Sequence, residues 1–101
     1  MRVISQDGLY DVPYEALAIR FHENDGTIIL GVPLSVVSMD LVSDVPLITL
    51  GIYSTETKAK KAMEMLHNEY MQYATAKSED YWFAFDYPKV FQFPADEDVE
   101  V

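Results

Sequence analysis

The sequence predicts an α+β fold: a mainly antiparallel sheet of five or six strands with one long amphipathic helix packed on one face. Two observations support this prediction. Between residues 15 and 32, two apolar runs flank a turn-forming segment, as in a β-hairpin. Between residues 55 and 75, apolar residues recur every three or four positions, which is the period of an amphipathic helix. The chain has 101 residues, enough for a single core, and we expect residues 1–94 to form one domain.

The N-terminal residues are expected to form two short strands. Residues 3–5 are the first strand, and Gln6-Asp7-Gly8 is a turn signal. Pro13 lacks a backbone N–H, so the segment from residue 10 to 14 is predicted to be an edge strand.

The next segment carries the clearest strand pattern. Leu17, Ile19 and Phe21 alternate with small or polar residues, as in a half-buried antiparallel strand. Glu23-Asn24-Asp25-Gly26 contains residues that tolerate a positive φ angle, and an apolar run from Thr27 follows at once. We therefore expect a hairpin here.

Two further strands are expected before the helix. Residues 36–42 alternate in polarity, and Ser43-Asp44-Val45-Pro46 is a turn signal. Residues 47–53 are the most apolar run, which favours the centre of the sheet.

The helix is predicted from about residue 55 to 75. Ser54 or Thr55 is a suitable N-cap, and Glu56 in the first turn complements the helix dipole. One face collects the apolar residues, namely Ala59, Ala62, Met63, Leu66, Tyr70, Tyr73 and Ala74.

The C-terminal part is aromatic and then acidic. Residues 81–86 are predicted to form the last strand, and residues 90–94 an extended segment after Pro88. Residues 95–101 include four acids, and we expect a solvated, flexible acidic tail.

Charge limits the classes of partner. Seventeen acidic and seven basic residues give a net charge of −10, which disfavours direct binding to duplex DNA or an anionic membrane. A partner protein with a basic surface is the natural complement. With no cysteine, secretory signal or long apolar run in the sequence, we expect a cytoplasmic protein that does not span a membrane.

The sequence contains no pattern typical of an active site. His22 and His67 lack metal-ligand spacing, and the glycines at 26 and 31 are followed by Val32-Pro33 rather than a phosphate-loop Lys-Ser/Thr pair. We therefore expect a protein that is not an enzyme, with no catalytic residues, no metal site and no cofactor.

Candidate binding residues come from the aromatic segment and the acidic turns. Trp82 is expected on the sheet face opposite the helix, where an aromatic residue meets a partner chain or stacks on a ligand ring. Homo-oligomerisation is therefore one expectation. The proposed binding residues are Trp82, Tyr81, Tyr87, Arg20, Asp40 and Asp44.

Several blocks of the sequence resemble small uncharacterised phage and prophage proteins of Gram-positive bacteria. They are Met1-Arg2-Val3-Ile4-Ser5-Gln6-Asp7-Gly8, then Asp11-Val12-Pro13-Tyr14-Glu15, then residues 53–56 with Lys58-Ala59 and Lys61-Ala62-Met63-Glu64-Met65-Leu66. The blocks cover about a third of the chain. The resemblance implies a phage origin and a site of action in the host bacterial cytosol, and it identifies no functional residue.

Three functions remain open from the sequence. The acidic surface could block a basic channel of a host defence protein, as several anti-CRISPR inhibitors do. Alternatively, an oligomer could sequester a nucleotide immune signal, a cyclic nucleotide or an ADP-ribose derivative. Trp82, Tyr81 or Tyr87 would then stack on the base, and Arg2, Arg20 or a helix lysine would bind the phosphate. The third function is a phage structural or assembly component.

Overall fold

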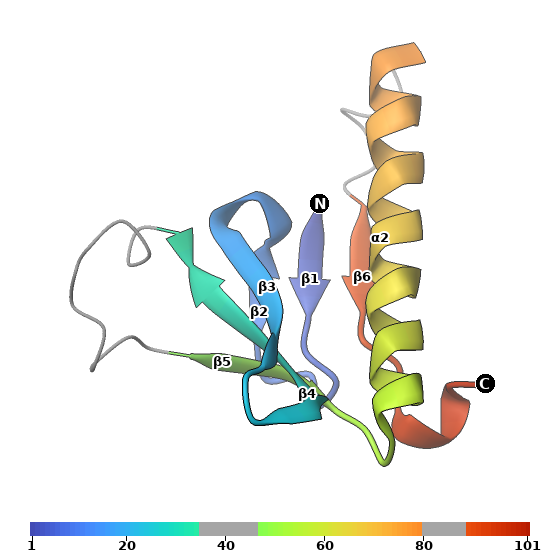
Figure 1. Cartoon of the computed structure of the whole chain (residues 1–101). Helices are drawn as coiled ribbons and strands as arrows, with labels where there is room; N and C mark the ends of the chain where they lie inside the picture. The colour runs from blue at the N-terminus through green and yellow to red at the C-terminus, as the bar shows by residue number, and fades with distance from the viewer. Residues whose placement is uncertain (35–46, 80–88) are drawn as a thin grey trace.

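In the computed structural model, which describes residues 1–34, 47–79 and 89–101, the chain forms two three-stranded sheets and one long helix (Figure 1). The α+β class and the mainly antiparallel pairing are confirmed. The strands are divided between two sheets instead of forming one. The elements are β1 (Arg2–Ile4), β2 (Asp11–Pro13), η1 (Tyr14–Ala16), β3 (Leu17–His22), β4 (Asp25–Pro33), β5 (Ile48–Ile52), α2 (Glu56–Glu79), β6 (Val90–Gln92) and η2 (Asp96–Asp98).

The first sheet has the order β2-β1-β6. β1 pairs antiparallel with β2, with Val3 opposite Val12, and parallel with β6, with Val3 opposite Phe91. β2 is an edge strand, as Pro13 predicts. The extended segment predicted after Pro88 contains β6, which reaches β1 only after the chain has passed along α2.

The second sheet is the antiparallel meander β3-β4-β5. The predicted hairpin is confirmed as β3 and β4, but its turn contains no positive φ angle; among the described residues only Gly8 has one, at 76°. Side chains stabilise the turn instead. The Asn24 N–H donates to His22 Nδ1 (3.0 Å), and the Thr27 N–H donates to Asp25 Oδ1 (3.0 Å).

Among the described strands, β5 is at the edge of its sheet and not at the centre, so that part of the prediction was wrong. β4 takes the central place. A bulge interrupts the pairing, because Gly51 faces Ile29 and Thr49 faces Leu30, which leaves Leu50 as the extra residue. The bulge changes which side chains point inward: Leu50 is fully buried, whereas Ile52, which strict alternation would place on the same face, is 55% exposed.

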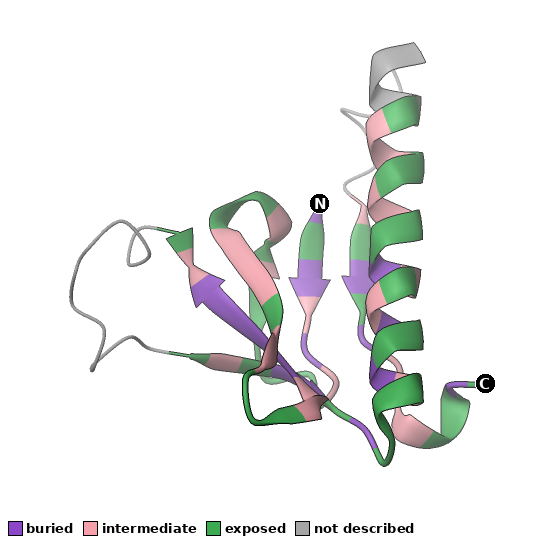
Figure 2. Ribbon diagram, in the orientation of Figure 1, coloured by how far each residue is buried: buried purple, intermediate pink, exposed green. Residues whose placement is uncertain are grey.

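The helix α2 begins where the sequence predicts and ends later, at Glu79. Thr55 is the N-cap, since its Oγ1 accepts the Lys58 N–H (3.2 Å). Ala59, Ala62 and Leu66 are fully buried, and Figure 2 shows the buried stripe on the side of the helix that faces the strands, with exposed residues on the other side. The predicted apolar face is confirmed.

One core joins both sheets, the helix and the C-terminal segment. Its fully buried side chains include Val3, Ile29, Leu50 and Leu66, one from each of four elements, and Phe93 is 1% exposed. The strands predicted at 36–42 and 81–86 lie outside the described residues.

Part of the C-terminal segment packs against the domain, so the segment is not solvated over its whole length. Val99 is 3% exposed and belongs to the core, and η2 lies beside the start of α2 (Figure 1). The sequence pattern suggests a solvated tail because acids surround Val99 on both sides. Burying this one apolar side chain holds the segment against the domain.

Gln6 connects the two sheets. Its backbone N–H donates to the Leu50 carbonyl (2.7 Å), and its side-chain Oε1 accepts the Ile52 N–H (3.0 Å). Its Nε2 donates to the Pro94 carbonyl (3.2 Å), which also accepts the Tyr53 hydroxyl (2.8 Å). The turn after β1 thus covers part of the outer edge of β5.

We expect Gln6→Ala to lower the free energy of unfolding by about 1–2 kcal/mol, because two side-chain hydrogen bonds are lost. Chemical denaturation monitored by circular dichroism measures this change. The control is Gln72→Ala on the exposed side of α2, for which we expect a change within about 0.5 kcal/mol. Equal effects of the two substitutions would contradict the role given to Gln6.

Candidate functional site

Of the binding residues proposed from the sequence, Arg20 alone lies within the described residues. It is exposed on β3, and its Nη1 donates to the Phe21 carbonyl (3.2 Å). The other five residues, Trp82, Tyr81, Tyr87, Asp40 and Asp44, lie outside the described residues.

The described residues place a group of acids at one end of the molecule, which we call the acidic end. The β3–β4 turn, the start of α2 and η2 all lie at this end (Figure 1). Close contacts join the turn to the start of the helix: a Cβ on Gly26 would lie 2.8 Å from Glu56 Oε1, and the Tyr53 N–H donates to the Thr27 carbonyl (2.9 Å). The acidic end consists of Glu23, Asp25, Glu56, Asp96, Glu97, Asp98 and Glu100.

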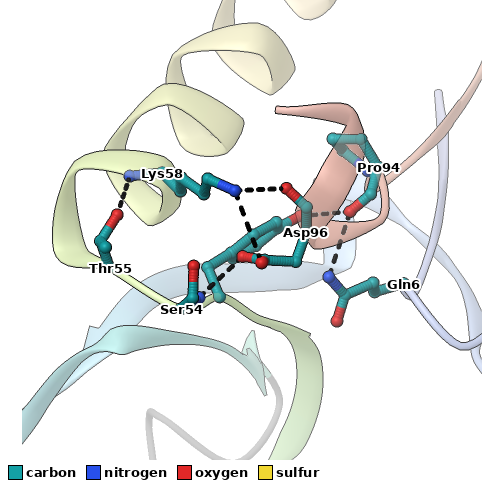
Figure 3. A network of polar contacts seen from close by, with 7 residues as sticks. Gln6, Ser54, Thr55, Lys58, Pro94 and Asp96 are labelled. Carbon is teal, nitrogen blue, oxygen red and sulfur yellow. Dashed lines mark hydrogen bonds and ion pairs between the residues drawn. The ribbon is translucent and has the colours of Figure 1, made fainter. Parts of the chain in front are cut away.

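Asp96 attaches η2 to the start of the helix (Figure 3). Its Oδ1 accepts the Ser54 N–H (2.7 Å), and its Oδ2 lies 3.5 Å from Lys58 Nζ, which also donates to the Asp96 carbonyl (3.0 Å). The carboxylate also suits the positive end of the helix dipole. Asp96 therefore holds its acidic neighbours Glu97 and Asp98 in place.

Two acids of this end are stabilised in their charged form. The Ser54 N–H lowers the pKa of Asp96 below its ordinary value, and Lys58 contributes in the same direction. The Thr27 hydroxyl and N–H lower the pKa of Asp25. Both carboxylates are ionised at neutral pH.

Few basic groups offset this charge. Among the described residues, Lys58 is the basic side chain that forms an ion pair with the acidic end. Other cations are paired elsewhere: Arg2 with Asp11 (2.6 Å), Lys89 with Glu69 (2.6 Å) and Lys61 with Glu64 (3.9 Å). Lys60, one turn into α2, is exposed. The acidic end therefore carries a clear excess of negative charge.

A hollow of about 150 Å³ lies next to Gln6, at the edge of β5. Asp7 supplies its one carboxylate; Asp7 Oδ1 accepts the Ser5 hydroxyl (2.5 Å) and the Leu9 N–H (3.0 Å). These two bonds, the Ser5 bond first, lower the pKa of Asp7. The lining residues are Gln6, Asp7, Thr49, Leu50, Gly51 and Ile52.

Metal sites and membrane-spanning helices are two further possibilities in the described part of the chain. There, no group of three or more histidine, cysteine or acidic side chains is arranged to hold a metal ion. Of the described helices, none is both long enough and apolar enough to cross a membrane. His22 Nδ1 is occupied by the Asn24 N–H in the hairpin turn (3.0 Å).

No family model matches the chain, and no significantly similar protein was found among curated proteins or solved structures. Geometry and charge are therefore the observations that define the candidate site.

Sequence reasoning missed Asp7 and Asp96 as site residues. Asp96 lies in a segment whose acidic composition suggested a solvated tail, and the signal that it is anchored is Val99, an apolar residue among acids. The signal for the hollow is Gly51, since glycine within a strand often marks a bulge. Neither signal identifies the residues that Asp7 and Asp96 contact.

Asp96→Asn should lower the melting temperature at pH 7, and the difference from wild type should close in acid. Because the folded-state pKa of Asp96 lies below its ordinary value of 3.8, its contribution is complete above that value. The contribution is lost as the pH falls through the folded-state pKa. Thermal melts between about pH 7 and pH 2.5 measure this closure.

Glu97→Gln is the matched control, because it removes one charge from the same turn without touching Ser54. We expect it to lower the melting temperature at pH 7 less than Asp96→Asn does. A difference between Asp96→Asn and wild type that stays constant down to the lowest pH would contradict the assigned role.

Proposed function

We propose that this protein is a non-enzymatic, phage-type accessory protein that inhibits a host defence protein by binding its basic surface. The observation that supports this proposal best is the acidic end. Among the described residues, it combines seven carboxylates with one lysine, Lys58, that already forms an ion pair. The resemblance of the sequence to phage and prophage proteins supports the proposal that it acts in the cytosol of a host bacterium.

The physical basis is competition for a basic surface. A basic groove that binds nucleic acid attracts any array of negative charges, and complementary potentials accelerate encounter and select the partner. At physiological salt the screening length is about 8 Å, so neighbouring carboxylates on one short turn reinforce one another. Glu97 and Asp98 are adjacent and exposed on η2.

Rigidity of the charged surface also supports binding. Asp25 and Asp96 are each fixed by hydrogen bonds from backbone N–H groups, so their charges keep a defined position relative to the helix start. A preorganised array loses little conformational entropy on association. This arrangement suits stoichiometric inhibition.

A second candidate is an oligomeric protein that sequesters a nucleotide immune signal. The observations that favour it are the aromatic residues Tyr81, Trp82 and Tyr87 in the sequence and the exposed Arg20 on β3. The 150 Å³ hollow is smaller than the roughly 300–1,000 Å³ of ordinary ligand pockets, so a nucleotide would need a different site.

The two functions are separated by light scattering and a thermal-shift screen with cyclic nucleotides and ADP-ribose derivatives. Inhibition through the acidic end predicts no shift in melting temperature. An oligomer whose melting temperature rises by several degrees with one of these nucleotides would support the second candidate instead.

Removing charge from the acidic end should weaken binding to the basic partner. Glu97→Gln combined with Asp98→Asn removes two charges, and we expect the dissociation constant to rise about 10-fold or more at 0.15 M salt, and less at higher salt. The control is Asp11→Asn with Glu64→Gln, which removes two charges from exposed ion pairs elsewhere.

The partner is found by comparing what wild type and the two double variants retain from a host lysate, and it is then purified for titration calorimetry at two salt concentrations. Inhibition is scored by phage plating on a host that carries the defence gene. Equal binding and equal plating with both double variants would overturn the proposal.

A further inference from the structure

The hollow beside β5 exists because of the bulge in that strand. The extra residue, Leu50, is buried in the core, and the buried Gly51 makes room for the Tyr53 ring, since a Cβ there would lie 2.8 Å from it. Residues Thr49 to Ile52 form one side of the hollow. Gln6 and Asp7 form the opposite rim, and hydrogen bonds from Gln6 to Leu50 and Ile52 fix the distance between the two sides.

The lining has two chemical parts. The half-exposed Ile52 is the apolar part, whereas Asp7 contributes a negative charge at the rim. Asp7 Oδ1 is held by Ser5 and Leu9, but a carboxylate has about four acceptor positions, so the group can accept further donors. The lining contains no basic residue that would compete for this carboxylate.

We infer that this hollow receives an arginine side chain of the basic partner, with its methylene groups on Ile52 and its guanidinium on Asp7. The inference rests on the proposed function for the existence of a basic partner. The hollow adjoins the acidic end through Gln6 and the Pro94 carbonyl, two residues before Asp96.

Volume and charge select this occupant. The hollow of about 150 Å³ is small and open to solvent, which suits the end of one long side chain better than a nucleotide, since pockets for small molecules usually span roughly 300–1,000 Å³. Arginine fits better than lysine because its planar guanidinium is more weakly hydrated and forms paired bonds to a carboxylate. The net charge of −10 disfavours an acidic occupant, including a second copy of this chain.

The test is a titration of the full-length, ¹⁵N-labelled protein with N-acetyl-arginine-N-methylamide, followed by amide chemical shifts. We expect saturable shifts at Asp7, Thr49, Gly51 and Ile52 with a dissociation constant of about 1–30 mM, typical of a small ligand. The citrulline analogue has almost the same shape without the charge, and it should give at most a tenth of that affinity. Equal shifts with citrulline, or no saturable shift at these residues, would overturn the inference.

Two variants test the two parts of the hollow. Asp7→Asn removes the charge while keeping an oxygen for Ser5 and Leu9, and we expect it to weaken arginine binding at least 5-fold. Ile52→Ser removes the exposed apolar wall and should weaken it about 2- to 5-fold. Unchanged affinity in both variants, with wild-type spectra elsewhere, would overturn the inference.

The same variants separate this inference from the proposed function. If Asp7→Asn binds the basic partner as wild type does, while Glu97→Gln with Asp98→Asn does not, the arginine site is wrong and the proposed function stands. If arginine shifts the hollow residues but no basic partner needs the acidic end, the proposed function fails and the arginine site stands.

Discussion

The arrangement of the whole molecule depends on the hydrogen bonds that meet at Gln6 and the Pro94 carbonyl. The Pro94 carbonyl accepts hydrogen bonds from Gln6 Nε2 and from the Tyr53 hydroxyl. Burial of Tyr53 raises the pKa of this hydroxyl. Gln6 also binds β5 through its backbone N–H and Oε1. The two three-stranded sheets share one core with α2. This junction fixes the turn after β1 against β5, while Asp96 fixes η2 beside the helix start.

The acidic residues have two roles that one structure combines. Asp96 stabilises the start of α2, and Asp25 shapes the hairpin turn, so part of the negative charge contributes directly to folding. Glu97 and Asp98 are then displayed on the turn that Asp96 anchors. Exposed ion pairs contribute little to stability. The main effect of the pairs elsewhere on the surface is that acids neutralise the basic side chains of Arg2 and Lys89. Among the described residues, the negative charge that remains is concentrated at the acidic end, where partner binding is proposed.

Local patterns predicted the helix and the hairpin well because both depend on contacts between residues close in sequence. Thr55 caps the helix through a bond only three residues away, and β3 and β4 are joined by a short turn. The place of β5 was predicted wrongly for the opposite reason. Its apolar composition suits a central strand, but its outer edge is covered by Gln6, which is 46 residues from Ile52. Composition cannot distinguish a strand that is flanked by another strand from one whose outer edge is covered by the turn that carries Gln6.

By itself the sequence determined the α+β class, the apolar face of α2, the hairpin and the excess of negative charge, because each follows from composition or short-range spacing. Only the tertiary structure decided that Asp96 and Val99 hold the C-terminal segment against the helix start. It also decided that a bulge at Leu50 opens a hollow beside Asp7. Both features join residues more than forty positions apart. Such contacts arise from burial of a shared core, for which a single sequence carries no local signal.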